Sequence, residues 1–156
     1  MSTLTLRTEG DRSIVVTRHF AASPEAVYRA HTEARLIQQW CLGPDGWTMP
    51  VCLCDARVGG KIRYEWSNGA GRSFFLTGEF VELEPFSRIV HIERMHLPDP
   101  TPDNRVESRF DPDGTGTLLT MRMTLPDLAT RTAMLSTGME HGMEASYVRL
   151  ETMREP

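Results

Sequence analysis

Residues 13–30 read SIVVTRHFAASPEAVYRA, and this stretch decides the fold because it joins a strand to a capped helix. Its first eight residues are rich in β-branched side chains, which predicts a strand. Ser23 is a favourable N-cap, Pro24 suits a first helical turn, and Glu25 complements the positive end of the helix dipole. A short helix ending near Ala30 is therefore predicted directly after the strand.

A second helix and six more strands follow along the chain. The helix is predicted over 33–40, where Leu36, Ile37 and Trp40 share one side. Apolar, β-rich runs separated by turn signals predict strands near 47–55, 61–67, 73–84, 88–96, 104–111 and 116–125. Because no helical pattern lies between these strands, we expect them to form an antiparallel meander.

The last part of the chain changes to a helical period. Asp127 can cap a helix that is predicted to run through Met153. Its apolar side chains recur at helical spacing: Met139, Met143, Tyr147, Leu150 and Met153. This stripe must be buried, and the sheet is the surface available to cover it.

Length and charge limit the function classes. The 156 residues suit a single domain over 12–156, which we expect to follow a flexible polar tail over 1–11. The formal net charge of −4 argues against nucleic acid as a partner. No apolar run is long enough for a membrane span or a secretory signal, so we expect no membrane association and a cytoplasmic location.

Seven short strings occur in the order found in a known family. They are FAASPEAVYRA at 20–30, Trp40 with Gly43-Pro44, GWTMPV at 46–51, Asp55 with RVGG at 57–60, GEF at 78–80 with Glu84-Pro85, GT at 116–117 before LTM at 119–121, and GMEHGME at 138–144 with Tyr147 and Leu150. On these strings the chain resembles the helix-grip superfamily (START-like, SRPBCC). Within it, the chain is similar to bacterial domains that resemble the C-terminal domain of the activator of heat-shock protein 90 ATPase.

The resemblance implies an α+β helix-grip fold in the element order β-α-α-β6-α. In this fold a seven-stranded antiparallel sheet wraps round a long C-terminal helix, with a cavity between the two. The fold hosts lipid carriers, hormone receptors, polyketide cyclases and cochaperones, so it does not fix the ligand.

Strand parity predicts which side chains line the cavity. Ile62, Tyr64 and Trp66 share one face of their strand and should point towards the helix. Gly138 and Gly142, one helical turn apart, either allow close packing on the sheet or leave room for a ligand. The expected ligand-cavity residues are Trp40, Ile62, Tyr64, Trp66, Phe80, His91, Glu93, Phe110, Met121, Met123, Gly138, Met139, Gly142 and Met143.

The candidate catalytic residues are His91, Glu93 and His141. On strand 88–96 the parity is ambiguous, so His91 and Glu93 are either ionisable groups inside an apolar cavity or ordinary solvated charges. His141 lies close in sequence to Glu144, and the two form either acid–base machinery or a plain surface pair.

The sequence predicts neither a metal nor a cofactor. The histidines lack metal-ligand spacing, and Cys41, Cys52 and Cys54 lack the second pair that a zinc site needs, so free thiols are expected. The leading hypothesis is binding of an unidentified apolar small molecule between sheet and helix. The alternatives are a cyclase- or hydrolase-type enzyme and a protein-interaction module for a chaperone, and a homodimer is left open.

Overall fold

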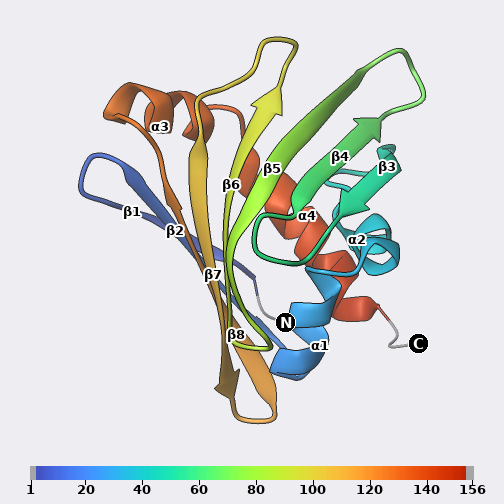
Figure 1. The fold of residues 1–156 in the computed structure, drawn as a ribbon, viewed down its shortest axis with the longest axis vertical. Helices are drawn as coiled ribbons and strands as arrows, with labels where there is room; N and C mark the ends of the chain where they lie inside the picture. The colour runs from blue at the N-terminus through green and yellow to red at the C-terminus, as the bar shows by residue number, and fades with distance from the viewer. Residues whose placement is uncertain (1–2, 154–156) are drawn as a thin grey trace.

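The computed structural model describes residues 3–153, which form one curved antiparallel sheet with α4 lying across its concave side (Figure 1). The strands are β1 (Thr5–Glu9), β2 (Ser13–Phe20), β3 (Thr48–Cys54), β4 (Lys61–Ser67), β5 (Ser73–Glu84), β6 (Arg88–His96), β7 (Asn104–Asp113) and β8 (Gly116–Thr124). The helices are α1 (Pro24–Ala30), α2 (Ala34–Trp40), α3 (Leu128–Leu135) and α4 (Met139–Thr152).

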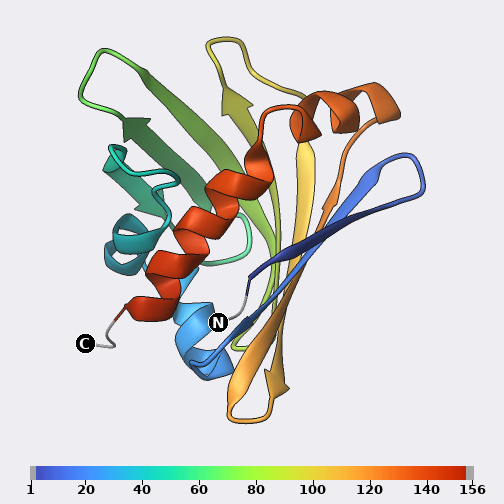
Figure 2. The same cartoon turned by 180° about the vertical axis from the view of Figure 1, so that it is seen from behind.

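The strands follow the spatial order β1-β2-β8-β7-β6-β5-β4-β3, and every neighbouring pair is antiparallel. Figure 2 shows α4 crossing the concave face, with α1 and α2 beside it. This arrangement confirms the α+β helix-grip fold class that the sequence predicts.

The sheet has eight strands instead of the seven expected, because part of the segment taken as a flexible tail is a strand. Residues Thr5–Glu9 pair with β2, from Thr5 opposite Thr17 to Glu9 opposite Ser13. Leu6 packs against the core and anchors this edge strand. The expectation of a tail over 1–11 is therefore wrong from Thr5 onwards, and Met1 and Ser2 lie outside the described residues.

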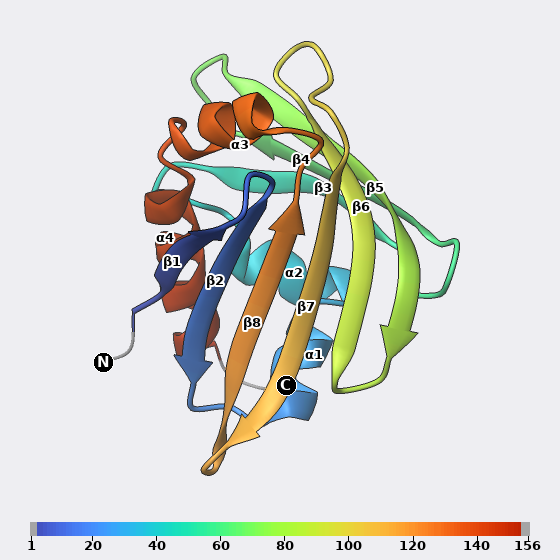
Figure 3. The same ribbon diagram turned by 90° about the vertical axis from the view of Figure 1, so that its left-hand side faces the viewer.

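The single C-terminal helix expected over 127–153 is two helices. Asp127 caps α3 by accepting a hydrogen bond from the Thr130 backbone N–H at 2.8 Å. Gly138 then adopts a left-handed conformation, with φ 79° and ψ 24°, and α4 begins at the next residue. A left-handed residue cannot continue a right-handed helix, so Gly138 divides the segment in two. Figure 3 shows α3 at the end of the sheet, away from the body of α4.

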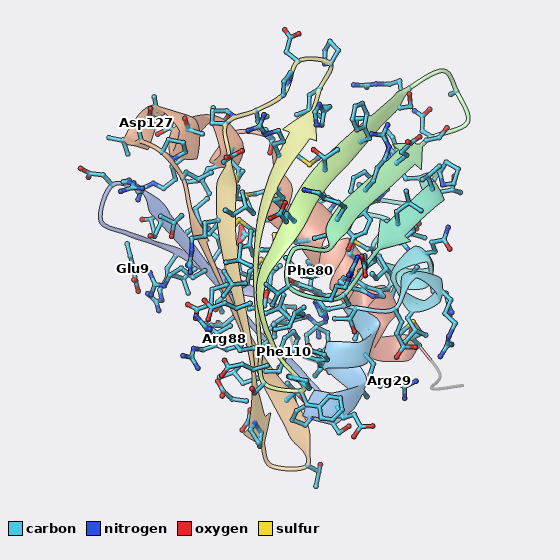
Figure 4. All side chains as sticks on the ribbon, viewed as in Figure 1. Glu9, Arg29, Phe80, Arg88, Phe110 and Asp127 are labelled. Atoms are coloured by element: carbon cyan, nitrogen blue, oxygen red, sulfur yellow. The ribbon has the colours of Figure 1, made fainter. Side chains whose placement is uncertain are left out.

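The core lies between the concave face of the sheet and the helices. Phe80 and Phe110 are 2% and 1% exposed, and Figure 4 shows both in the middle of the molecule, with Glu9 and Asp127 at its periphery. Within residues 3–153, none of the helices has the length and apolar character needed to cross a membrane.

The connection between β3 and β4 packs its backbone against β5. Gly60 donates its N–H to the Arg57 carbonyl at 2.7 Å and accepts from the Phe80 N–H at 3.0 Å. A Cβ atom on Gly60 would lie 1.8 Å from the Asp55 carbonyl oxygen, whereas one on Gly59 would meet nothing within 4 Å. Gly60 is therefore required by close backbone approach, and Gly59 by its φ of +83°.

Gly60→Ala is expected to lower the free energy of unfolding by about 3 kcal/mol, because the turn must move to admit a methyl group. Gly59→Ala is the matched control and should cost about 1 kcal/mol, the strain of a left-handed alanine. Urea denaturation midpoints of both variants and the parent measure the difference. Equal midpoints for the two variants would contradict this account of the turn.

Candidate functional site

The pairing of β5, β6 and β7 decides which face of β6 points inward. Buried Phe80 stands opposite His91, and His91 in turn stands opposite buried Val106. Glu93 lies two residues further on the same face, opposite buried Asn104. His91 and Glu93 therefore both face the helices, which resolves the ambiguity in the sequence.

His91 and Glu93 form a hydrogen-bonded pair inside the fold. His91 Nε2 lies 2.7 Å from Glu93 Oε1, so the ring N–H donates to the carboxylate. The side chains are 18% and 21% exposed, so solvent or a small molecule can reach them although they face inward. A carboxylate that fixes the imidazole in this way leaves Nδ1 as an acceptor or base.

His31, which the sequence analysis did not single out, lies at the C-cap of α1 with intermediate exposure, and its Nε2 atom is buried. Its Nδ1 lies 2.8 Å from the Val27 carbonyl and donates to it, so Nε2 carries a lone pair. The ring packs on Trp40 and Phe110, at centroid distances of 4.8 and 5.2 Å. Burial, with a smaller contribution from the charge of His91, lowers the pKa of His31 to about 4, so the imidazole is neutral at pH 7.

Tyr147 brings a buried phenol next to Trp40. Its ring stacks on Trp40 at 6.0 Å and meets Phe20 edge-on at 5.5 Å. Burial raises the pKa of Tyr147, so the phenol keeps its proton. Trp40 itself is fixed by donating its Nε1–H to the Ala30 carbonyl at 2.8 Å.

The apolar side chains around the polar groups are only partly covered. Tyr64, Met95 and Met121 point inward from the sheet, and Met139 and Met143 belong to α4, yet all five are of intermediate exposure. The other expected cavity residues of the sheet and α2 are buried in the core: Trp40, Ile62, Trp66, Phe80, Phe110 and Met123.

An open hollow of about 310 Å³ lies at the end of β4, β5 and β6. Trp66, Phe74 and Pro98 are among its lining residues, and the Trp66 and Phe74 rings stack at 4.9 Å. Trp47 meets Phe74 edge-on at 5.3 Å and extends this aromatic group. Aromatic side chains therefore line the edge of the interior at this end of β4, β5 and β6.

Three of the expected site residues belong to α4 or to its N-cap: Gly138, His141 and Gly142. His141 is exposed on α4, so the structure does not bring it to the pair. Gly138 is exposed at the N-cap of α4 and is not inside a helix. A Cβ atom on Gly142 would touch only Pro44, at 4.0 Å, so the space beside this glycine is open.

An ion-pair cluster that the sequence analysis missed fastens α4 to β2. Arg18 is 2% exposed, and its guanidinium lies 3.2 Å from both Glu144 and Glu151. Each carboxylate also accepts a backbone N–H at 2.9 Å, from Leu4 and Ala21 respectively. The cluster therefore holds the helix that forms one wall of the interior.

The three thiols are free, as expected, and are held in a protonated state. Burial raises the pKa of Cys41 to about 12, and the negative charge of Glu93 adds to the rise. Burial likewise raises the pKa of Cys52 to about 12. Neutral thiols are poor nucleophiles. In the part of the chain that is described, no three His, Cys, Asp or Glu side chains are grouped to hold a metal ion.

Comparisons with known proteins agree with this architecture. Residues 21–155 match the family model described as Activator of Hsp90 ATPase homolog 1-like protein. Among curated proteins, no relative matches the chain.

Several solved structures are similar over nearly the whole chain. A Rhodobacter sphaeroides protein is 30% identical with a TM-score of 0.90, covering 96% of this chain and 97% of its own. A Chromobacterium violaceum protein is 27% identical with a TM-score of 0.77, covering 92% and 98%. A Mycobacterium smegmatis protein, 16% identical with a TM-score of 0.85 and coverage of 97% and 98%, shares the fold.

Proposed function

The chain belongs to the Activator of Hsp90 ATPase homolog 1-like family, and from that premise we propose that it binds an apolar small molecule between sheet and α4. Polar contacts at His91, Glu93 and the buried groups near Trp40 would then orient the molecule. The free thiols suit a reducing compartment, so a cytoplasmic location is part of the proposal.

One observation carries the proposal: inward-facing apolar side chains remain partly exposed. A fully packed core covers its side chains, but Tyr64, Met95, Met121 and Met143 face the interior and are not covered. Methionine adapts its shape to a ligand at low cost, so a lining of this kind suits a site that holds different apolar molecules. The open space beside Gly142 lies along α4, the helix that also carries Met143.

Native mass spectrometry of freshly purified protein tests the proposal. We expect a noncovalent adduct of one small molecule for each chain, removed by mild heating or organic extraction. Delipidated protein should then bind the neutral dye Nile red with enhanced fluorescence. Absence of both the adduct and the dye signal would overturn the proposal and favour the chaperone-interaction module. The same spectrum reports whether the chain is a homodimer.

A second candidate function, an enzyme of the cyclase or hydrolase type, is favoured by the His91–Glu93 pair. A carboxylate that holds an imidazole at 2.7 Å is an arrangement able to move a proton from a bound substrate. Chemical conversion of the bound molecule by the purified protein would favour this candidate over a carrier. An unchanged molecule recovered after long incubation would favour the carrier.

A further inference from the structure

The segment that contains α3 spans the gap between the sheet and α4 at one end of the molecule. It follows Thr124, the last residue of β8, and ends before Met139, the first residue of α4. The turn between β1 and β2 lies at the same end, because Ser13 stands opposite Thr124. Figure 3 shows α3 at this end, between the top of β8 and the start of α4.

The two ends of this segment are held differently. Leu125 is 1% exposed, donates its N–H to the Arg12 carbonyl at 2.9 Å and accepts from Arg12 Nε at 2.8 Å. At the other end Gly138 has a φ of +79°, and a Cβ atom there would meet nothing within 4 Å. The segment therefore runs from a fixed point at Leu125 to a glycine that is free to change its backbone angles.

Few contacts hold α3 against the rest of the protein. None of its residues is buried, and Met134 and Leu135 are partly covered by packing on the core. Its Arg131 reaches the turn between β1 and β2, where Nη1 donates to the Gly10 carbonyl at 2.6 Å. The Ser13 and Glu9 carbonyls lie further from the same nitrogen, at 3.3 and 3.4 Å.

The contact through Arg131 is a weak latch. One nitrogen serves three carbonyls, and the bond to Gly10 is the short one. Arg131 Nε is buried and has no hydrogen-bond partner within residues 3–153. A buried donor without a partner costs free energy, and this cost offsets part of what the closed position of α3 gains.

The apolar lining of α4 begins where α3 ends. Met139 and Met143 occupy the first two turns of α4 and are partly exposed, and the open space beside Gly142 lies between them along the helix. Movement of α3 away from the turn between β1 and β2 would uncover this part of the interior.

We propose that α3 is a gate, latched by Arg131 and hinged at Gly138, through which the apolar molecule enters and leaves. This inference rests on the proposed function, since it concerns access to the same interior. A contact that holds the gate closed in both the empty and the loaded protein slows entry and exit alike. The latch therefore sets the rates of binding and leaves the dissociation constant unchanged.

Stopped-flow fluorescence of Nile red on the delipidated full chain tests the latch. Arg131→Met keeps a long apolar stem and removes the donor. We expect the association and dissociation rate constants both to rise about 5-fold, with the dissociation constant within about 2-fold of the parent. Arg109→Met is the matched control on β7, where the side chain is 54% exposed, and should leave both rate constants unchanged.

A second pair of variants tests the hinge independently of the latch. Gly138→Ala strains the closed hinge without a steric clash, and movement of α3 relieves the strain, so both rate constants should rise about 3-fold. Gly114→Ala carries the same kind of strain, at a φ of +63° and with nothing within 4 Å, but lies in the turn between β7 and β8 at the opposite end of β8. It should leave both rate constants unchanged, and thermal melts establish that each variant is folded.

The outcomes separate the gate from the proposed function. Failure of the parent to bind the dye would overturn the proposed function. Dye binding by the parent, with parental rate constants in folded Arg131→Met or in folded Gly138→Ala, would overturn the gate alone. A changed dissociation constant without a rise in both rate constants would also overturn the gate, since the substituted residue would then contribute to binding itself.

Discussion

Arg18→Met is expected to lower the free energy of unfolding by about 3–5 kcal/mol, the largest loss we predict for a single side chain. The guanidinium is buried, and its removal leaves Glu144 and Glu151 facing each other without a cation. The methionine fills much of the volume, so the loss reports on charge and hydrogen bonding and not on a cavity. Urea denaturation measures this loss, with the free energy of unfolding of variant and parent falling at the same slope with urea concentration.

Arg122→Met is the matched control on the outer face. Arg122 pairs with Glu9 at 2.7 Å, but the two side chains are 40% and 37% exposed, so the pair should contribute less than about 1 kcal/mol. A change at Arg18 no larger than that at Arg122 would show that the buried cluster does not hold α4 in place.

The same cluster predicts how stability depends on pH. Burial acts to raise the pKa of Glu144, but hydrogen bonds from Arg18 and the Leu4 N–H outweigh it and hold the pKa below its ordinary value of 4.5. A depressed carboxyl pKa stabilises the fold above the unfolded value and loses that contribution as pH falls through the folded value. The stability difference between the parent and Arg18→Met should therefore shrink as pH falls below about 4.5.

Gly142→Leu is expected to weaken Nile red binding about 10-fold or more while the thermal midpoint stays equal or rises. The new side chain would enter the open space beside α4, where a Cβ atom meets only Pro44 at 4.0 Å. The helix gains by losing a glycine, by up to about 1 kcal/mol. Val148→Leu, on the exposed side of the same helix, is the control and should change neither quantity.

The opposite pattern would assign Gly142 to close packing. If Gly142→Leu clearly lowers the thermal midpoint and leaves dye binding unchanged, the leucine has overpacked a contact between α4 and the loop at Pro44. The site of binding would then lie elsewhere in the interior.

Local chemistry in the sequence was enough to predict most of the fold. Ser23 caps α1 as its residue type indicates, and the β-branched run before it is β2. β1 was missed because four of its five residues are polar. Its strand conformation depends on pairing with the neighbouring strand β2. The break at Gly138 was missed because the apolar stripe keeps its spacing through α4 and shows nothing of the backbone conformation at its start.

The candidate site depended more heavily on tertiary pairing. Both faces of β6 mix apolar and charged residues, so only the partners Phe80 and Val106 place His91 inside. Arg18 did leave a signal, since it alternates with Ile14, Val16 and Phe20 on the inward face of β2. His31 left none, because its role depends on Trp40 and Phe110 from other elements.

The division of the C-terminal segment at Gly138 gives its two helices separate local stabilities. None of the residues of α3 is buried, whereas α4 buries Ser146, Tyr147 and Leu150. Opening α3 uncovers only the partly buried Met134 and Leu135, so we expect its amide hydrogens to exchange with solvent through local unfolding. We expect the amide hydrogens of α4 to be protected up to the global unfolding of the sheet. The end of the molecule near α3 can thus fluctuate on its own while the helix across the sheet stays folded.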